Sequence, residues 1–550
     1  MKGFWLRFAL LVSSYRVFSS IDLFGWTISM TLGTRLVVMA VTAGETDTTV
    51  GSDEHNENTK DDNDMLASYD PATGGLLGKV PIATRQDVET AVEKARDAQR
   101  SHWGKLSINE REEIVIKAYE SLTQSDDEEA EKEIEKTIEQ QLGELLAMEM
   151  GKDIRRATGE VRGATKAGPY YAREAARAFQ PFPLRQGMQY FNPLGVVGLI
   201  APWNYPVMMA NNLMVPALVA GNAVILKPSE ETPLIAQEFF GRLADALPES
   251  VLQIVHGDGQ VGTYLVESPN VNMIAFTGSQ AAGRDIMSRA GKTLKRLVME
   301  LGGNDPLIVM KDADLDKAAR FAIGGGFENS GQMCTSVERV YVDEEIASEY
   351  MEKLVNLAKD HSTVGPWNGT DVNIGPIINA KQHAKILDHI MDAKEKGGHF
   401  LLGGEDDSYN PPYIAATIIA NMTPDMKMEQ EETFGPVIGI STYTTVDEAI
   451  DRANDSVYGL GAVVFGQDDG IFTAQEVAAQ LEAGMVGINT AQGLSGGPWV
   501  GAKQSGFGYH GTIEGHRQFT QIKSVAIDHS SVKGEDSNAC PALKFRKMYS

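Results

Sequence analysis

Short apolar runs alternate with amphipathic segments through the first half of the chain. Helical periodicity at 232–248, with Thr232 as its cap, and at 281–290 predicts two of the intervening helices. Short apolar strands alternating with helices are typical of a parallel sheet covered on both faces, so the predicted fold class is α/β. Five apolar runs read as strands: 195–203, 222–229, 251–259, 272–279 and 295–303.

Polar residues follow these predicted strands closely. Trp203 and Asn204 end the first, Lys227 the second, Gly278 and Ser279 the fourth, and Glu300 the fifth. Chemistry in parallel α/β sheets gathers at the carboxyl ends of the strands, so we expect these positions to line a site.

A second unit is predicted from about residue 301 to 495. It contains helical patterns near 347–359 and 380–396, a strand-like stretch at 437–443, and a lone thiol, Cys334, in a short polar turn. We find no internal repeat. Length and hydrophobic content are sufficient for two or three structural units.

The formal net charge of −26 disfavours non-specific nucleic-acid binding, because phosphates would be repelled. Much of this charge lies in two acidic runs, at 45–64 and 126–139, which we interpret as a solvated linker and a solvated helix face.

The first 44 residues are basic and serine-containing, which predicts a mitochondrial or other organelle transit peptide. A cytoplasmic protein, or one associated with a membrane through this segment, is the alternative. No uncharged apolar run reaches the roughly 18 residues of a membrane span. Two cysteines, Cys334 and Cys540, cannot form a disulfide framework, and they indicate a reducing compartment.

Taken alone, Cys334 is either a small buried hydrophobe or a nucleophile. A nucleophilic thiol needs a base, a cation or aligned N–H groups that favour the thiolate. Glycines at 324–326 and 331 permit close backbone approach, and the polar residues 329–332 argue against a simple core strand.

Seven sequence blocks, in this order and at these spacings, resemble the aldehyde dehydrogenase superfamily over roughly residues 65–527. They are PWNYP (202–206), LKPSEETP (226–233), FTGSQAAG (276–283), ELGGNDP (300–306), SGQMC (330–334), EETFGPV (431–437) and KQSGFG (503–508).

The resemblance implies oxidation of an aldehyde to a carboxylic acid through a thiohemiacetal and a thioester on Cys334, with hydride transfer to NAD. It assigns the Asn204 amide and the Cys334 backbone N–H to the developing oxyanion. Glu300 would be the general base that activates water for thioester hydrolysis. No metal site is expected.

The cofactor site is also implied by the resemblance. Lys227 and Glu230 would hold the adenosine ribose, and a carboxylate there would repel a 2′-phosphate, which favours NAD while leaving NADP open. The block 278–283 would present N–H groups to the pyrophosphate. The full set of expected cofactor positions is Trp203, Lys227, Glu230, Gly259, Phe276, Gly278, Ser279, Gly283, Leu301, Glu432 and Phe434.

The family also implies a Rossmann-like cofactor-binding domain, an α/β catalytic domain and a small β oligomerisation arm, hence a homodimer or homotetramer. The expected boundaries are 1–44 (targeting segment), 45–65 (acidic linker), 66–300 (NAD-binding domain, with the arm near 175–192), 301–495 (catalytic domain), 496–530 (return segment and oligomerisation strand) and 531–550 (tail).

Departures from the family pattern bear on the substrate. Asn304 stands where many members have Lys, and neither Lys nor Arg occurs from 453 to 502, which should border the substrate mouth. A neutral or apolar aldehyde is therefore expected rather than a carboxylate-bearing one. Three alternatives stay open: an NADP-preferring enzyme, a coenzyme A-acylating enzyme, and a non-catalytic binding protein of the same fold.

Overall fold

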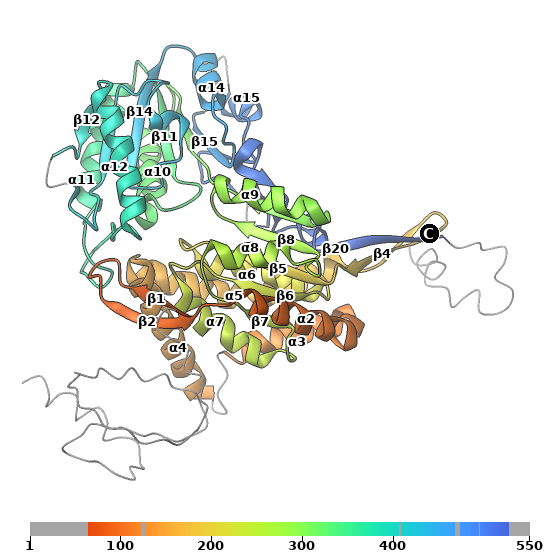
Figure 1. Cartoon of the computed structure of the whole chain (residues 1–550). Coiled ribbons are helices and arrows are strands. Elements are labelled where there is room, and N and C mark those ends of the chain that lie inside the picture. The colour runs from red at the N-terminus through yellow and green to blue at the C-terminus, as the bar shows by residue number, and fades with distance from the viewer. Residues whose placement is uncertain (1–63, 123–127, 406–408, 468–472, 494–495, 527–550) are drawn as a thin grey trace, which may run out of the picture. The chain divides into compact units, whose positions relative to one another are not determined.

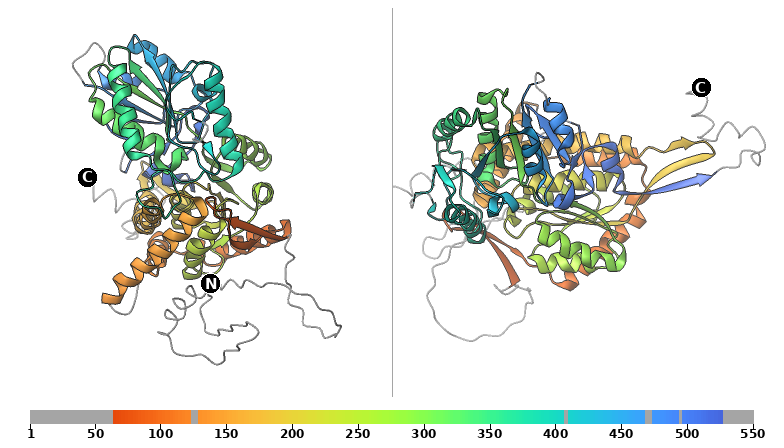
Figure 2. Two further views of the ribbon diagram at one scale, coloured as in Figure 1. Left: turned by 90° about the vertical axis from the view of Figure 1, so that its left-hand side faces the viewer. Right: turned by 90° about the horizontal axis from the view of Figure 1, so that it is seen from above.

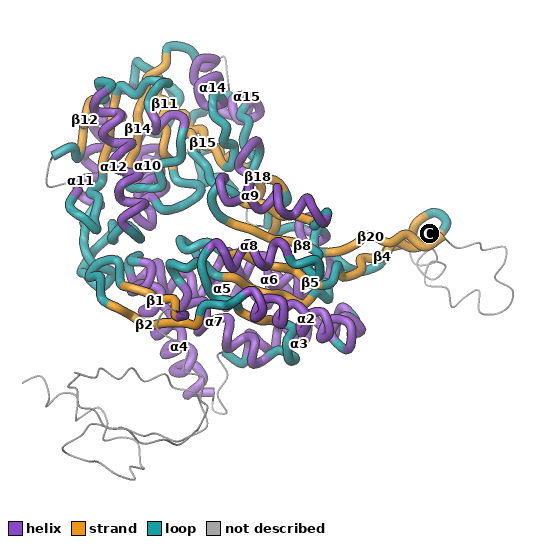
Figure 3. The backbone as a smooth tube through the Cα atoms, viewed as in Figure 1, coloured by secondary structure: helices purple, strands orange, loops and turns teal. Residues whose placement is uncertain are grey.

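The computed structural model of the chain describes residues 64–122, 128–405, 409–467, 473–493 and 496–526, with the backbone alone for 128–137. The predicted targeting segment, nearly all of the acidic linker, the tail 531–550 and Cys540 lie outside these residues. The predicted α/β class is confirmed, with strands flanked by helices in each of the two larger sheets (Figures 1 and 3).

The first large sheet has the order β18-β9-β8-β5-β6-β7, in which all strands but β18 run parallel. The five predicted strands are all present in it, as β5 (Val196–Ile200), β6 (Ala223–Lys227), β7 (Leu252–Ile254), β8 (Met273–Thr277) and β9 (Arg296–Glu300). The sixth strand, β18 (Gly506–Phe507), was not predicted.

Both faces of this sheet are buried. In β5, Val197 and Leu199 join one core while Val196 and Ile200 join the other, as the period of two in a strand requires. The first core packs against α5 (Ile154–Ala178), α6 (Pro206–Val219) and α7 (Pro233–Ala246). The second packs against α2 (Arg85–Ser101), α8 (Gly259–Glu267) and α9 (Gln280–Ala290).

The second large sheet has the order β12-β13-β14-β11-β10-β15-β16, and only β12 runs antiparallel to its neighbour. Helices lie on both sides of it (Figure 2). Its strands are β10 (Asp305–Val309), β11 (Val337–Asp343), β12 (His399–Leu402), β13 (Thr417–Ala420), β14 (Val437–Tyr443), β15 (Gly461–Phe465) and β16 (Met485–Ile488). Its helices are α10 (Leu315–Phe327), α11 (Ala347–His361), α12 (Ala380–Glu395), α13 (Lys427–Gln430), α14 (Val446–Asn454) and α15 (Ala474–Gln480).

A three-stranded sheet joins distant parts of the chain. Strand β4 (Gly187–Pro193) pairs on one side with β3 (Phe182–Leu184) and on the other with β20 (Thr520–Ala526), which lies beside it in Figure 1. Leu184, Ile522 and Val525 are exposed on it.

The remaining elements are smaller or lie at the edges. They are β1 (Met65–Tyr69), β2 (Leu76–Pro81), α3 (Ile108–Glu120), α4 (Glu128–Met150), β17 (Trp499–Val500), β19 (Tyr509–His510), α16 (Ile513–Arg517) and the 3-10 turn η4 (Glu328–Gly331). No helix in the described part of the chain combines the length and apolar character needed to cross a membrane.

One local prediction is confirmed in position only. Thr232 occupies the N-cap position of α7 as predicted, but its hydroxyl makes no capping hydrogen bond. Instead, the carboxylate of Glu149 accepts the N–H groups of Leu234 and Ile235 at 2.8 Å each. A buried carboxylate from α4 therefore satisfies this helix start, a long-range contact that local sequence does not indicate.

Candidate active site

Cys334 lies just after η4, in a backbone of unusual conformation. Asn329, Ser330 and Gly331 all have positive φ, at 52°, 60° and 69°. At Gly331 a Cβ would lie 1.9 Å from the Gly435 carbonyl oxygen, so only glycine fits this contact between two loops. The two non-glycine left-handed residues each store roughly 1–3 kcal/mol. Strain of this kind persists only where the surrounding structure holds it, and here it precedes a half-buried thiol.

Asn204 lies against this thiol loop. Its side chain is buried, and Nδ2 donates a 3.0 Å hydrogen bond to the carbonyl oxygen of Gln332, two residues before Cys334. The Nδ2 group carries two hydrogens, so one donor is left after this bond. The structure thus brings together Asn204, which follows β5, and the loop of Cys334, which precedes β11.

A buried ion pair fixes the position of Asn204, and sequence reasoning missed it. Lys152 Nζ lies 2.7 Å from Glu160 Oε2 and donates a 2.6 Å hydrogen bond to the backbone oxygen of Asn204. Glu160 Oε1 accepts the N–H groups of Val207 and Met208 at the start of α6. Lys and Glu are usually surface residues, and no local spacing distinguishes this pair.

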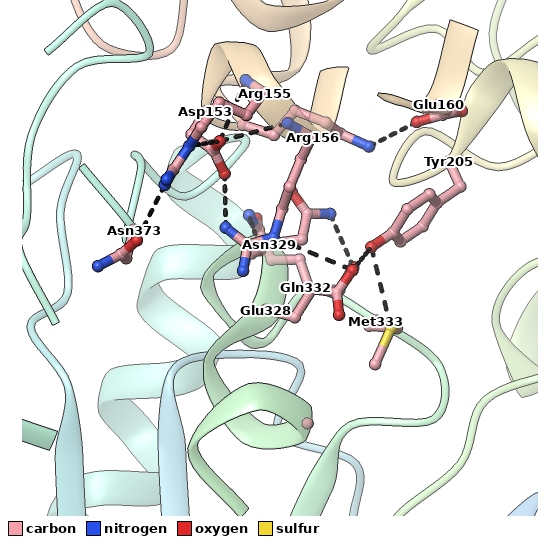
Figure 4. A network of polar contacts seen from close by, with 12 residues as sticks. Asp153, Arg155, Arg156, Glu160, Tyr205, Glu328, Asn329, Gln332, Met333 and Asn373 are labelled. Carbon is pink, nitrogen blue, oxygen red and sulfur yellow. Dashed lines mark hydrogen bonds and ion pairs between the residues drawn. The ribbon is translucent and has the colours of Figure 1, made fainter. Parts of the chain in front are cut away.

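A second polar group borders the thiol loop on the same side. The Tyr205 hydroxyl donates a 2.9 Å hydrogen bond to Glu328 Oε1 and lies 3.9 Å from the Met333 sulfur (Figure 4). Arg156 bonds Asp153 at 2.6 Å, and its Nε lies 4.0 Å from Glu328. Its positive charge is therefore already matched by two carboxylates.

Glu300 ends β9, and one hydrogen bond holds its side chain. The Thr277 hydroxyl donates at 3.3 Å to Oε2, whereas His510 Nε2 lies 3.4 Å from Oε1 without forming a hydrogen bond. Strand β18 pairs Gly506 with Glu300, which covers this end of the sheet. Burial raises the pKa of Glu300 to about 8. A carboxyl with such a pKa is well placed to act as a base near neutrality.

The thiol itself rests in its protonated form. Burial raises the pKa of Cys334 well above its ordinary value, and the charges of Glu432, Asp305 and Glu300 raise it further. Glu300 thus lies close enough to Cys334 to act on it electrostatically. A thiolate here needs either proton transfer to a base or added positive charge.

Lys227 and Glu230, which are expected to hold the adenosine ribose, contact each other. The buried Lys227 donates a 3.1 Å hydrogen bond from Nζ to Glu230 Oε2, and Glu230 is half exposed. Gly259 begins α8, and a Cβ there would meet no atom within 4 Å, so the space beside it is open.

The expected pyrophosphate site lies at the start of α9. Ser279 caps this helix, accepting the Ala282 N–H at 3.3 Å. Close packing explains the two glycines: a Cβ at Gly278 would lie 2.6 Å from the Phe276 ring, and one at Gly283 would lie 2.8 Å from Leu301. Gln280 Nε2 is buried without a hydrogen-bond partner among the described residues.

The expected nicotinamide side is formed by a loop between α13 and β14. The Phe434 and Trp203 rings meet edge to face at 5.3 Å, and Glu432 Oε1 accepts the Gly303 N–H at 3.0 Å. Burial raises the pKa of Glu432 to about 7. A helix start with an unpartnered donor, the accessible carboxylate of Glu230 and an aromatic pair have the chemistry that fits a nicotinamide dinucleotide.

Comparison with known proteins agrees with this arrangement. Residues 58–525 match the sequence profile of the aldehyde dehydrogenase family. A probable NADP(+)-dependent succinate-semialdehyde dehydrogenase of Sinorhizobium fredii is 36% identical over 84% of this chain and 92% of its own length. The peroxisomal aminoaldehyde dehydrogenase 2 of Pisum sativum is also 36% identical, over 84% of this chain and 92% of its own.

Solved structures show the same similarity. The lactaldehyde dehydrogenase of Escherichia coli superposes with a TM-score of 0.78 at 31% identity, covering 84% of this chain and 95% of that protein. The NAD-dependent aldehyde dehydrogenase of Sinorhizobium meliloti superposes with a TM-score of 0.77 at 32% identity, over 86% and 93%. The chain therefore belongs to the aldehyde dehydrogenase family, oxidoreductases that convert an aldehyde to the acid with NAD or NADP.

Proposed function

We propose that this enzyme oxidises a neutral aldehyde to the free acid with NAD, through a thioester on Cys334. The observation that carries the proposal is the convergence of Asn204, the Cys334 loop and Glu300, which come from two different sheets. Each has the chemistry that one step of such a reaction requires.

In the first step the Cys334 thiol gives up its proton to solvent, its sulfur attacks the aldehyde carbon, and the aldehyde oxygen gains negative charge. The free N–H of the Asn204 amide and the backbone N–H of Cys334 stabilise that charge. Lys152 holds Asn204 through its backbone oxygen, so the donor is placed before substrate arrives. When bound, NAD would be held by Glu432, Phe434 and Trp203 on its nicotinamide side, and it would supply the hydride acceptor that oxidation of the thiohemiacetal carbon requires.

In the last step Glu300 removes a proton from water, which attacks the thioester and releases the acid. Its pKa of about 8 makes it a stronger base than an ordinary carboxylate once ionised. The presence of this base favours hydrolysis over transfer of the acyl group to coenzyme A.

We propose NAD as the preferred cofactor because Glu230 occupies the ribose position. Its carboxylate can accept hydrogen bonds from both ribose hydroxyls, whereas a 2′-phosphate would be repelled. The NADP(+)-dependent relative from Sinorhizobium fredii keeps the alternative open to test.

The substrate proposal follows from the charges beside the thiol. Arg156 is matched by Asp153 and Glu328, so it offers little net attraction to a carboxylate substrate. The Tyr205 hydroxyl oxygen and the Glu328 carboxylate keep lone pairs that can accept hydrogen bonds from a neutral polar aldehyde. The named relatives act on succinate semialdehyde and on aminoaldehydes, which a substrate panel should include.

The remaining sequence predictions stand as proposals. The β3-β4-β20 sheet exposes apolar residues along strand edges, which supports pairing of subunits into a homodimer or homotetramer. We retain 66–300 as the NAD-binding domain and 301–495 as the catalytic domain. Residues 1–44 remain a proposed organelle-targeting segment.

The test is a spectrophotometric assay of the purified full chain with NAD or NADP against a panel of aldehydes, beside Cys334→Ala. We expect NADH formation that the variant abolishes, with free acid as product. An acyl thioester formed only with coenzyme A present would favour the acylating enzyme. Tight NAD binding without turnover of any aldehyde would favour the binding protein.

A further inference from the structure

The side chain of one buried glutamate holds residues 433 and 434 of the proposed nicotinamide loop. Glu338, which is 1% exposed, accepts the Thr433 N–H through Oε2 and the Phe434 N–H through Oε1, both at 2.7 Å. Each side-chain oxygen accepts one N–H, which fixes the carboxyl group and the two backbone N–H groups relative to each other. The proposed mechanism gives Glu338 no role.

The backbone carbonyl groups of the same two residues are held by a side chain from another element. Gln382 of α12 donates from Nε2 to the carbonyl oxygens of Thr433 and Phe434, at 3.0 and 3.1 Å. His389 Nδ1 lies 3.1 Å from the Thr433 hydroxyl. Two side chains thus use all four polar backbone groups of residues 433 and 434.

These hydrogen bonds from Glu338 and Gln382 hold Phe434 in a backbone conformation that a bulky residue disfavours. Phe434 has φ of 58°, a left-handed value that costs a bulky residue roughly 1–2 kcal/mol. This conformation places the Phe434 ring against Trp203, which comes from the first sheet. Without these hydrogen bonds, we expect Phe434 to leave the left-handed conformation and its ring to move away from Trp203.

The Glu338 hydrogen bonds also connect this loop to the segment that carries Cys334. Glu338 lies on β11, only four residues after Cys334, and the contact of Gly331 with Gly435 joins the two loops a second time. Glu338 therefore links Cys334 to the loop of Glu432 and Phe434 through the four residues that follow the thiol, which lead from a turn into the start of β11. Hydride transfer needs the reacting atoms held within narrow limits of distance and angle.

We propose that Glu338 is a positioning residue for the cofactor, holding residues 432–434 in register with Cys334 so that NAD binds and accepts hydride. This inference rests on the proposed function. Formation and hydrolysis of a thioester on Cys334 do not require the Glu338 hydrogen bonds, because Asn204 and Glu300 are held by other contacts.

The test compares two reactions of the full-length enzyme and its Glu338→Gln variant. Glutamine keeps the shape but turns an NH₂ group towards one of the two N–H donors. We expect the NAD dissociation constant, from quenching of tryptophan fluorescence, to rise about tenfold and kcat for aldehyde oxidation to fall about tenfold. Hydrolysis of an activated ester, which needs Cys334 and Glu300 but no hydride acceptor, should stay within about twofold.

Two further variants separate positioning from general stability. Glu429→Gln removes another buried carboxylate, one that binds Tyr341 and Ser441, and should leave NAD affinity unchanged. Glu338→Asp keeps the charge and both acceptors with a shorter reach, so it should restore part of the affinity and also serves if the glutamine variant does not fold.

Three outcomes would overturn the inference. These are unchanged NAD binding and oxidation in Glu338→Gln, equal losses of oxidation and ester hydrolysis, or the same loss of NAD affinity in Glu429→Gln. Failure of the proposed function looks different, because the unaltered enzyme would then show no NAD-dependent oxidation of any aldehyde.

Discussion

His510 Nε2 lies 3.4 Å from Glu300 Oε1, and both side chains are buried. Burial lowers the pKa of His510 to about 3, so the ring is neutral at the pH of catalysis. A neutral imidazole can donate one N–H to an ionised carboxylate or accept from a protonated one. The pair joins the proposed base to the segment that follows β18.

The first prediction concerns this pair. In His510→Ala water can reach the space beside Glu300 Oε1, which relieves part of the burial that raises the pKa of Glu300. That pKa should therefore fall by about 0.5–1 unit, and the ascending limb of the kcat profile should move to lower pH by the same amount. The control is His516→Ala, whose ring packs edge-on to Tyr171. Identical pH profiles in enzyme and His510→Ala would show that the His510 ring does not contribute to the burial of Glu300.

The pH dependence of the unaltered enzyme follows from Glu300. The base must be ionised to accept a proton, and burial raises its pKa to about 8. If hydrolysis limits turnover, kcat should therefore rise about tenfold per pH unit below pH 8 and level off above it. A flat kcat between about pH 6 and 9 would mean that hydrolysis is not limiting or that Glu300 is not the base.

Glu300→Gln separates acylation from hydrolysis. The variant keeps the side-chain shape but cannot accept a proton, so steady-state turnover should fall by about 10²- to 10⁴-fold. Rapid-mixing measurements should still show a burst of about one NADH per active site as the thioester accumulates. Loss of the burst together with turnover would place Glu300 in the earlier step instead.

Asn204→Ala tests the oxyanion donor. Removing one such donor typically lowers kcat by about 10²- to 10³-fold, and we expect a loss in this range. Alkylation of Cys334 by iodoacetamide measures thiol reactivity without an oxyanion and should change little. A parallel loss of alkylation would show that the substitution disturbs the thiol loop through the Gln332 contact.

Cofactor choice should depend on Glu230. Replacing it with Gln removes the charge that opposes a 2′-phosphate, so kcat/KM for NADP should rise about tenfold while that for NAD falls. The neighbouring Glu231 accepts a hydrogen bond from Asn379 and gives the matched control, Glu231→Gln. An equal gain in both variants would point to general electrostatics rather than ribose recognition.

The buried carboxyls around the thiol should make the fold less stable as pH rises through the neutral range. Burial raises the pKa of Glu300 and Glu338 to about 8, and of Asp305 and Glu432 to about 7. The unfolded chain releases these protons near the ordinary carboxyl pKa of about 4 to 4.5, so the free energy of unfolding falls between that pH and the folded values and levels off above them. Tm should drop between about pH 4.5 and 8, and less so in Glu300→Gln; an equal drop in both would contradict this cause.

The sequence by itself determined the alternation of strands and helices, the parallel first sheet and the thiol turn. Apolar runs bounded by glycine are local signals, and they placed β5, β6, β8 and β9 within a few residues of their observed bounds. Seven motif blocks also indicated the family, because spacing along a chain can be read without knowing any contact.

Only the tertiary structure decided which side chains support those motifs. Lys152 and Glu160, His510 and Glu338 act through contacts with residues from 47 to 210 positions away, and none belongs to a local pattern. Burial also sets the pKa of Glu300, and burial depends on the return of residues 506–510 to the first sheet. Desolvation and hydrogen bonding are properties of packed neighbours, so the electrostatics of this site arise only when distant segments meet.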